Sequence, residues 1–379
     1  MAAAPEHGAG PVKRALLIGL LLIPLLLIGV LLALVGTRAG NLWLLDRAGP
    51  YLPGELSVEE WRGNLLSGVD VGALNYRQGD AEQTLAVALS DLQLELAPGE
   101  LLGGWLVIQA LRAEQVTLTL PAGEPEEPDA PPFELPDSLT LPLGVRVETL
   151  SVGRFTLAGE SPLHIDRIEA RELAAWRKLN LPRVALSVAD TRLHANLSGP
   201  LSAPYDLRGE LDWRRPAAPD AVPQTAGRLR LKGTPENLRV EHALSAPAQL
   251  ITEGELGYRD GQVHLDLRHH WPAQPLPVET PVPARLGEGE LTTKGTLDRV
   301  RLQGQTSLTA DGRPLAVTLA GDAGLDGLTL DTLSLKNDGQ SLTLSGRLDY
   351  QDGLAWNLDA RGQHLNPATL APAWPGDLT

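Results

Sequence analysis

The chain has 379 residues, a formal net charge of −15 at pH 7 and no cysteine. A nucleic acid is therefore not the expected partner, because phosphate binding requires a basic stripe. Disulfides, thiolate nucleophiles and cysteine-ligated metal sites are excluded by the absence of cysteine. Hydrophobic residues make up 43% of the chain but aromatic residues only 4%, so small and medium side chains supply most of its apolar surface.

An uncharged apolar stretch at residues 15–37 predicts a transmembrane helix. A bilayer core of about 30 Å needs roughly 20 apolar residues, whereas the hydrophobic part of a signal peptide usually has about 7–15. Cleavage before Gly36 is the alternative. Lys13 and Arg14 precede the stretch and favour a cytoplasmic N-terminus, with residues 1–14 as a disordered tail. The residues that we assign to the predicted anchor include Ala15, Leu22, Pro24, Leu32 and Thr37.

Beyond the predicted anchor, alternation of apolar and polar residues is the dominant pattern. Alternation with a period of two indicates β-strands that have one apolar and one polar face. The one candidate for an amphipathic helix is Ile168–Trp176. We therefore predict an all-β body, with a membrane-proximal part at 38–120 and a repeated part at 137–379. The apolar positions of the alternation are Leu92, Leu94, Leu96, Val116, Leu118, Leu120, Val145, Val147, Val184, Leu186, Val188, Val263, Leu265, Leu267, Leu315, Val317 and Leu319.

A proline-rich acidic insert at residues 121–136 separates the two parts. Its composition predicts a solvated loop. The acidic residues raise the alternative of a calcium site, which we reject because prolines stiffen the chain where such a site needs a tight, glycine-kinked loop. The acidic residues concerned are Glu124, Glu126, Glu127 and Asp129.

Internal repeats are the second strong pattern. Gly227–Thr234 recurs as Gly289–Thr296, with Lys-Gly-Thr at the end of both segments. Gly209–Trp213 recurs as Gly254–Tyr258 and again as Gly-Arg-Leu-Asp-Tyr at 346–350. Asp-Gly at 260–261 and again at 352–353 is the dipeptide of a two-residue hairpin turn. Each repeat is thus predicted to be a strand, a turn and a strand.

A stack of such repeats forms a long sheet, which twists as strands are added. We predict that the sheet curls into an open groove with its apolar face inside. Because its side chains are small or medium in size, the groove would stay unfilled and could hold alkyl chains. The alternative, which the pattern does not separate from it, is a closed β-solenoid with a filled core.

Two motifs near the start of the body resemble the opening of the TamB family. They are Trp61-Arg-Gly63 with the leucines that follow it, and Leu101-Leu-Gly-Gly-Trp105. The end of the chain is similar to the family as well. The residues concerned there are Gly346 to Tyr350, Trp356, Leu365 to Ala368 and Trp374 to Gly376.

The resemblance implies an AsmA-like protein of the bridge-like lipid transfer superfamily. Such a protein is a single-pass protein of the inner membrane of a Gram-negative bacterium, with a long β groove in the periplasm. Phospholipid would move along the groove between the inner and outer membranes, in support of outer-membrane protein assembly or secretion. The implied partner is a TamA-like outer-membrane barrel. Family members are much longer, so we expect this chain to be an N-terminal part whose partner-binding region is absent.

Motifs for catalysis or metal binding are missing from the sequence, and we predict a protein that is not an enzyme and has no cofactor. Neither a Gly-x-Ser-x-Gly elbow, nor a phosphate-binding glycine loop, nor His-Glu-x-x-His occurs. His269 and His270 are adjacent and would face opposite sides of a strand, so they cannot easily bind one metal ion. We expect them in an exposed turn before Trp271.

Two functions of different class stay open at this point. The protein is either a lipid conduit or a structural, chaperone-like tether that offers sheet edges to unfolded outer-membrane strands by β-augmentation. A conduit needs an apolar interior along its groove. A tether needs accessible backbone edges instead.

Overall fold

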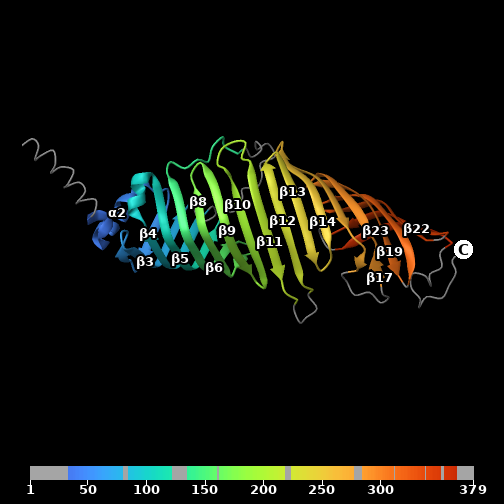
Figure 1. Cartoon of the computed structure of the whole chain (residues 1–379), viewed down its shortest axis with the longest axis horizontal. Coiled ribbons are helices and arrows are strands. Elements are labelled where there is room, and N and C mark those ends of the chain that lie inside the picture. Colours follow the sequence, from blue (N-terminus) through green and yellow to red (C-terminus); the bar gives the residue numbers. More distant parts are fainter. Residues whose placement is uncertain are drawn as a thin grey trace, which may run out of the picture. The chain divides into compact units, whose positions relative to one another are not determined.

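The computed structural model describes residues 33–79, 84–121, 135–159, 162–217, 223–276, 284–310, 312–337, 339–350 and 354–364. Within these ranges the chain is mostly β-strand, as predicted (Figure 1). No helix of this described part is long and apolar enough to cross a membrane. The predicted tail at 1–14, most of the predicted anchor at 15–37 and most of the insert at 121–136 lie outside the described residues.

The chain divides into two compact units. The first unit comprises Met1–Glu124 and Leu143–Leu173, and the second comprises Pro125–Pro142 and Ala174–Thr379. Elements of the first unit are α2 (Arg38–Ala48), the 3-10 helices η1 (Gly49–Tyr51) and η2 (Pro98–Gly103), and strands β1 (Glu55–Glu59), β2 (Arg62–Asn64), β3 (Gly68–Gln78), β4 (Leu85–Leu96), β5 (Trp105–Thr119), β6 (Gly144–Ala158), β7 (Leu163–Ile165) and β8 (Arg167–Ala175), which ends at the boundary.

A small packed core lies at the start of the first unit. Trp61, Val69 and Val71 are buried against one another, and Leu45 of α2 packs against them. Thr37 caps α2, because its side chain accepts a hydrogen bond of 3.0 Å from the N–H of Gly40. The Trp-Arg-Gly motif thus supplies the tryptophan that fixes the helix against the first strands.

Strands β5 and β6 form a parallel pair, whereas the other pairs of the first unit are antiparallel. A parallel pair needs a crossover of a dozen or more residues, which the segment containing the acidic insert provides. The helix considered for Ile168–Trp176 is wrong. Strand β8 occupies this segment, where Ile168 and Ala170 point inward between exposed charged residues and Glu172 has a positive φ of 58°.

The second unit is a succession of antiparallel strands. They are β9 (Lys178–Val188), β10 (Thr191–Pro200), β11 (Leu207–Arg215), β12 (Thr225–Thr234), β13 (Asn237–Ala246), β14 (Leu250–Arg259), β15 (Gln262–Trp271), β16 (Gln274–Pro275), β17 (Ala284–Leu286), β18 (Gly289–Thr296), β19 (Arg299–Ala310), β20 (Arg313–Gly324), β21 (Gly327–Asn337), β22 (Gln340–Asp349) and β23 (Ala355–Gln363).

The sequence repeats correspond to equivalent pieces of this sheet. Asp260 and Gly261 have φ angles of 53° and 76°, so they form the predicted turn between β14 and β15. Gly233 and Gly295 end the two Lys-Gly-Thr repeats with φ angles of 130° and 146°. At both sites an added Cβ would lie 2.2 Å from a backbone oxygen of the next strand, so only glycine fits.

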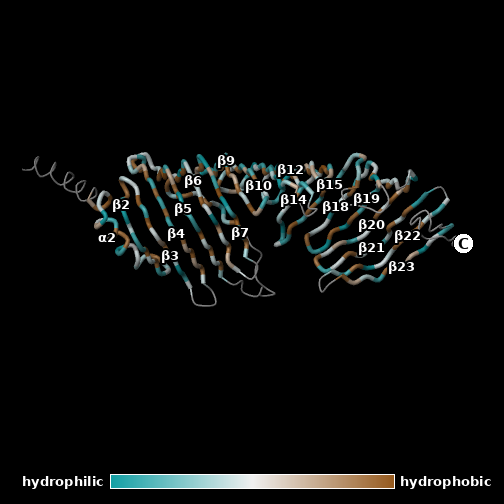
Figure 2. The backbone as a smooth tube through the Cα atoms, turned by 90° about the horizontal axis from the view of Figure 1, so that it is seen from below, coloured by the Kyte–Doolittle hydropathy of each residue, from teal (hydrophilic) through white to brown (hydrophobic). Residues whose placement is uncertain are grey.

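In the described part of the second unit, β9 pairs with β10 and β23 pairs with β22, and no described pairing joins β9 to β23. Figure 2 shows hydrophobic and hydrophilic residues alternating along these strands. The pairing does not separate the open groove from the closed solenoid, so the curl into a groove stays a prediction.

Candidate functional site

One face of the second unit is apolar across all its long strands, from β9 to β23. The register mostly places apolar residues and glycines opposite one another from strand to strand, although Thr306 opposes Val317. We call this surface the apolar face. One of its rows runs through Leu193, Trp213, Gly227 and Leu244. The neighbouring row runs through Ala195, Leu211 and Leu229 at one end of the unit and through Leu319, Leu333, Leu344 and Ala360 at the other.

All nine candidate positions of the second unit lie on this face. Val184 and Leu186 oppose Ala195 and Leu193 on the neighbouring strand, and the other candidates follow the same alternation. These candidates are Val184, Leu186, Val188, Val263, Leu265, Leu267, Leu315, Val317 and Leu319.

Most side chains of the apolar face are only half-buried. Among the described residues of the unit, Val240, Leu265 and Leu330 are buried on this face, whereas Leu229, Leu319 and many others keep part of their surface exposed. A filled core would bury nearly all of them. Apolar surface of this extent without a covering layer is unusual for a monomeric domain and indicates a binding surface.

Glycines on the apolar face make room for large rings on the next strand. A Cβ added at Gly227 would lie 2.3 Å from Cζ2 of Trp213, and one added at Gly289 would lie 2.6 Å from Cζ2 of Trp271. Each tryptophan therefore lies flat over a glycine instead of projecting from the sheet. These two tryptophans therefore cover backbone and do not fill the space above the face.

A short polar row interrupts the apolar face. The ring of His269 hydrogen-bonds through Nδ1 to Thr252 Oγ1 and through Nε2 to Thr293 Oγ1, both at 2.8 Å. On the other side of Thr252, His242 stacks on Trp213 with ring centroids 5.3 Å apart. Burial lowers the pKa of both histidines, and the neighbouring His242 lowers that of His269 further. This environment therefore favours the neutral form of both rings. Both ring nitrogens of His269 have a hydrogen-bond partner.

The opposite face of the second unit is charged. Ion pairs cross between neighbouring strands, with Arg228 Nε 2.6 Å from Asp212 Oδ1 and Lys294 Nζ 2.6 Å from Asp266 Oδ2. The hydrogen bond from Arg347 lowers the pKa of Asp326. These side chains are exposed and screened by solvent, so each pair contributes little to stability.

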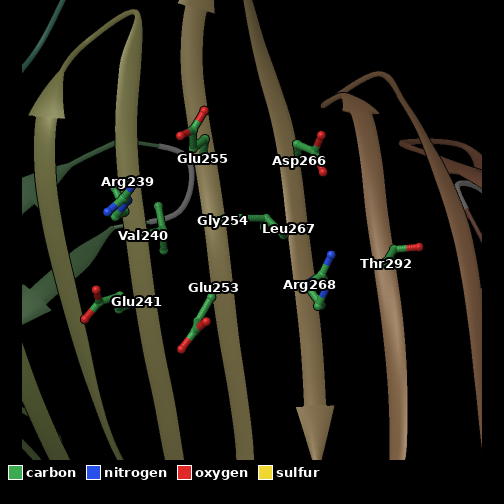
Figure 3. Close-up of a pocket in the computed structure, with 10 residues that line it drawn as sticks. All are labelled: Arg239, Val240, Glu241, Glu253, Gly254, Glu255, Asp266, Leu267, Arg268 and Thr292. Carbon is green, nitrogen blue, oxygen red and sulfur yellow. The ribbon is translucent and has the colours of Figure 1, made fainter.

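A depression of about 470 Å³ lies on this charged face, over β13, β14, β15 and β18 (Figure 3). Its lining mixes acidic side chains such as Glu253 and Asp266 with basic ones such as Arg239 and Arg268. No group of three or more potential metal ligands occurs in the described part of the chain. Because the lining carries both signs of charge, it favours neither an anionic nor a cationic ligand.

The candidates of the first unit occupy three kinds of position. Leu92 and Leu94 pack against the core of Trp61, Val69 and Val71. Leu120 lies just beyond the end of β5, and 51% of it is exposed. The remaining candidates oppose apolar residues of neighbouring strands; they are Leu96, Val116, Leu118, Val145 and Val147.

The expected exposed turn at His269 and His270 is wrong. Both residues belong to β15 and face opposite sides, so that His269 reaches Thr252 and Thr293 while His270 is exposed. Sequence reasoning did not find the polar row, because its members come from four strands and only the register brings them together. The sequence signal for the polar row is that His242 and His269 stand at positions where the alternation of their strands otherwise places apolar residues.

The comparisons with known proteins agree with this architecture. A family model described as the TamB N-terminal domain matches residues 27–139 and 127–379. The chain belongs to the TamB family. Neither the curated proteins nor the solved structures contain a match to it.

Membership of the TamB family points to a role in the translocation and assembly module. The family is associated with TamA and with membranes, and its members are anchored in the inner membrane with a periplasmic body. It is a family of bridge-like or assembly proteins without enzymatic activity.

Proposed function

We propose that this protein conducts phospholipids between the inner and outer membranes along the apolar face of its sheet. Residues 15–37 would cross the inner membrane once and hold the body in the periplasm of a Gram-negative bacterium. Conduction would support outer-membrane protein assembly or secretion together with a TamA-like barrel.

The observation that carries the proposal is the half-buried state of the apolar face. Leu229 and Leu319 are half-exposed and lie on either side of the polar row. The row through Leu256, Leu265 and Val300 consists of apolar residues and glycine and passes beside the polar row, so alkyl chains could slide from one strand to the next. Each CH₂ group removed from water contributes about 0.8 kcal/mol. Acyl chains would therefore be held by buried area alone, with no specific polar contact at each step.

A groove follows from the twist that strands impose on a long sheet. With the apolar face inside and the charged face in water, the groove would be lined by the candidates of the second unit. Glycines under the tryptophans support an unfilled interior, because they keep the largest side chains flat against the sheet.

The second candidate function is a tether for outer-membrane protein strands. It is favoured by the edge of β23, whose described pairing is with β22 alone. An added strand would bind this edge through backbone hydrogen bonds. Such binding would not depend on the half-buried leucines of the apolar face.

Lipid analysis of the purified protein tests the proposal. The membrane-extracted protein should carry phospholipid, detected by mass spectrometry, and Val317→Asp should carry much less. Thr318→Asp is the matched control, because Thr318 is exposed on the opposite face of the same strand. Equal lipid content in the original protein and both variants would contradict conduction along this face.

A further inference from the structure

We propose that one end of the strands of the first unit contacts the surface of a lipid bilayer. The contact is made by the turn between β2 and β3 and by η2, through Leu66, Leu101 and Leu102. This inference rests on the part of the proposed function that anchors the protein through residues 15–37.

The end of the uncharged apolar stretch lies against the β2–β3 turn. Asn41 donates hydrogen bonds from Nδ2 to the backbone oxygens of Leu34, at 2.8 Å, and Val35, at 3.0 Å. Its Oδ1 accepts a hydrogen bond of 3.0 Å from the N–H of Leu65. A Cβ added at Gly36 would lie 2.9 Å from Cδ1 of Leu66. The turn is thus held where the apolar stretch ends.

The helix η2 lies at the same end of the strands. Val69 at the start of β3 is paired with Leu94 near the end of β4, and η2 follows β4 directly. Neighbouring strands are about 4.8 Å apart, so η2 begins within about 10 Å of the β2–β3 turn. The two segments therefore border one edge of the unit.

The leucines at this edge are exposed to an unusual degree. Leu102 is 97% exposed, Leu101 is 49% exposed and Leu66 is 39% exposed. Burying a leucine side chain contributes about 1.5–3 kcal/mol, so water is an unfavourable environment for this group. A bilayer beside the apolar stretch is the partner that the position of these leucines favours.

Two ion pairs lie near this edge and Glu100 of η2 adds an exposed acidic side chain, so the contact does not depend on anionic lipids. Arg62 pairs with Glu60 at 2.8 Å and Arg112 lies 3.6 Å from Glu95. The driving force for the contact is therefore the insertion of the leucine side chains into the surface of the bilayer. The contact would place the first residues of β3 and β5 at the bilayer surface.

The absence of cysteine allows a direct test with single cysteine labels. Leu102→Cys, carrying an environment-sensitive fluorophore, is reconstituted as the full chain in phosphatidylcholine vesicles that contain spin-labelled lipid. The matched control is Leu325→Cys, because Leu325 is also a highly exposed leucine in a turn but belongs to the second unit and is not a candidate for the groove.

We expect the label at position 102 to shift to the blue and to be quenched severalfold more than the label at position 325. Leu66→Cys should behave like Leu102→Cys. Equal quenching at positions 102 and 325 would overturn the inference. Alkaline carbonate extraction of the same vesicles tests the anchor separately. Quenching at 102 in a protein that carbonate releases would support the contact and contradict the anchor, whereas a retained protein without quenching contradicts the contact alone.

Discussion

Oδ1 of Asn41 accepts a hydrogen bond of 3.0 Å from the backbone N–H of Leu65, and so joins the start of α2 to the β2–β3 turn. Asn41 is 1% exposed, and its amide group also satisfies two carbonyl groups that end the preceding helical turn. The side chain of Asn41 therefore hydrogen-bonds to carbonyl groups near the end of the apolar stretch and holds the β2–β3 turn next to them.

Replacement of Asn41 by alanine should loosen this junction. The substitution leaves the N–H of Leu65 and two carbonyl groups without their partner, at a cost of about 1–3 kcal/mol for a buried unsatisfied group. Amide hydrogen exchange around residues 61–68 should become faster. Asn75→Ala is the control, because Asn75 is exposed on β3. Unchanged exchange in Asn41→Ala would show that packing of Trp61 alone holds the turn.

The contact of Trp213 with Gly227 predicts a steric effect. Gly227→Ala places a Cβ 2.3 Å from Cζ2 of Trp213, so the ring must move off the sheet. We expect a loss of about 1–3 kcal/mol in the free energy of unfolding, as for other overpacked sites. The fluorescence of Trp213 and chemical denaturation measure the two effects. Gly159→Ala, where the added Cβ meets nothing within 4 Å, should change neither.

The lowered pKa of His269 predicts a loss of stability in mild acid. Burial lowers this pKa below the unfolded value of 6.5, so protons bind the unfolded chain first. Stability from this residue is therefore fully present above pH 6.5 and falls as the pH drops from 6.5 through the folded pKa. His269→Gln should reduce the change in denaturation midpoint between neutral pH and about pH 5. An unchanged difference between the two pH values would assign the effect to other groups.

Leu265 and Val317 share the apolar face but differ in burial. Leu265 is 9% exposed, whereas Val317 is half-buried. Leu265→Asp should therefore lower the free energy of unfolding by about 1–3 kcal/mol more than Val317→Asp, because a carboxylate at position 265 is less accessible to water than one at position 317. Chemical denaturation of the two variants measures this difference. Equal and large losses would indicate that the whole face is closed from water.

The strands and the apolar positions could be read from the sequence because alternation is a local property. Leu265 and Val317 lie on the same face although 51 residues separate them, since each follows the period of its own strand. The repeat glycines also had a local signal. Gly233 and Gly295 both follow lysine and precede threonine, and both adopt a positive φ angle.

Features that depend on register or on long connections were not predictable in the same way. The polar row of Thr252 and His269 exists because two strands pair with one particular offset. The parallel pairing of β5 with β6 depends on how a segment outside the alternating pattern crosses the sheet. Ile168–Trp176 was ambiguous because the alternation breaks after Ala170, at Glu172 with its positive φ of 58°.

Photo-crosslinking to lipid from neighbouring positions of β20 tests the central claim most directly. A photoreactive residue at position 317 lies on the apolar face, and one at 318 lies on the charged face. Conduction along the apolar face predicts phospholipid crosslinks from position 317 and few from position 318, in a protein that is fully folded. No lipid crosslink from 317, or equal crosslinks from both positions, would contradict the account.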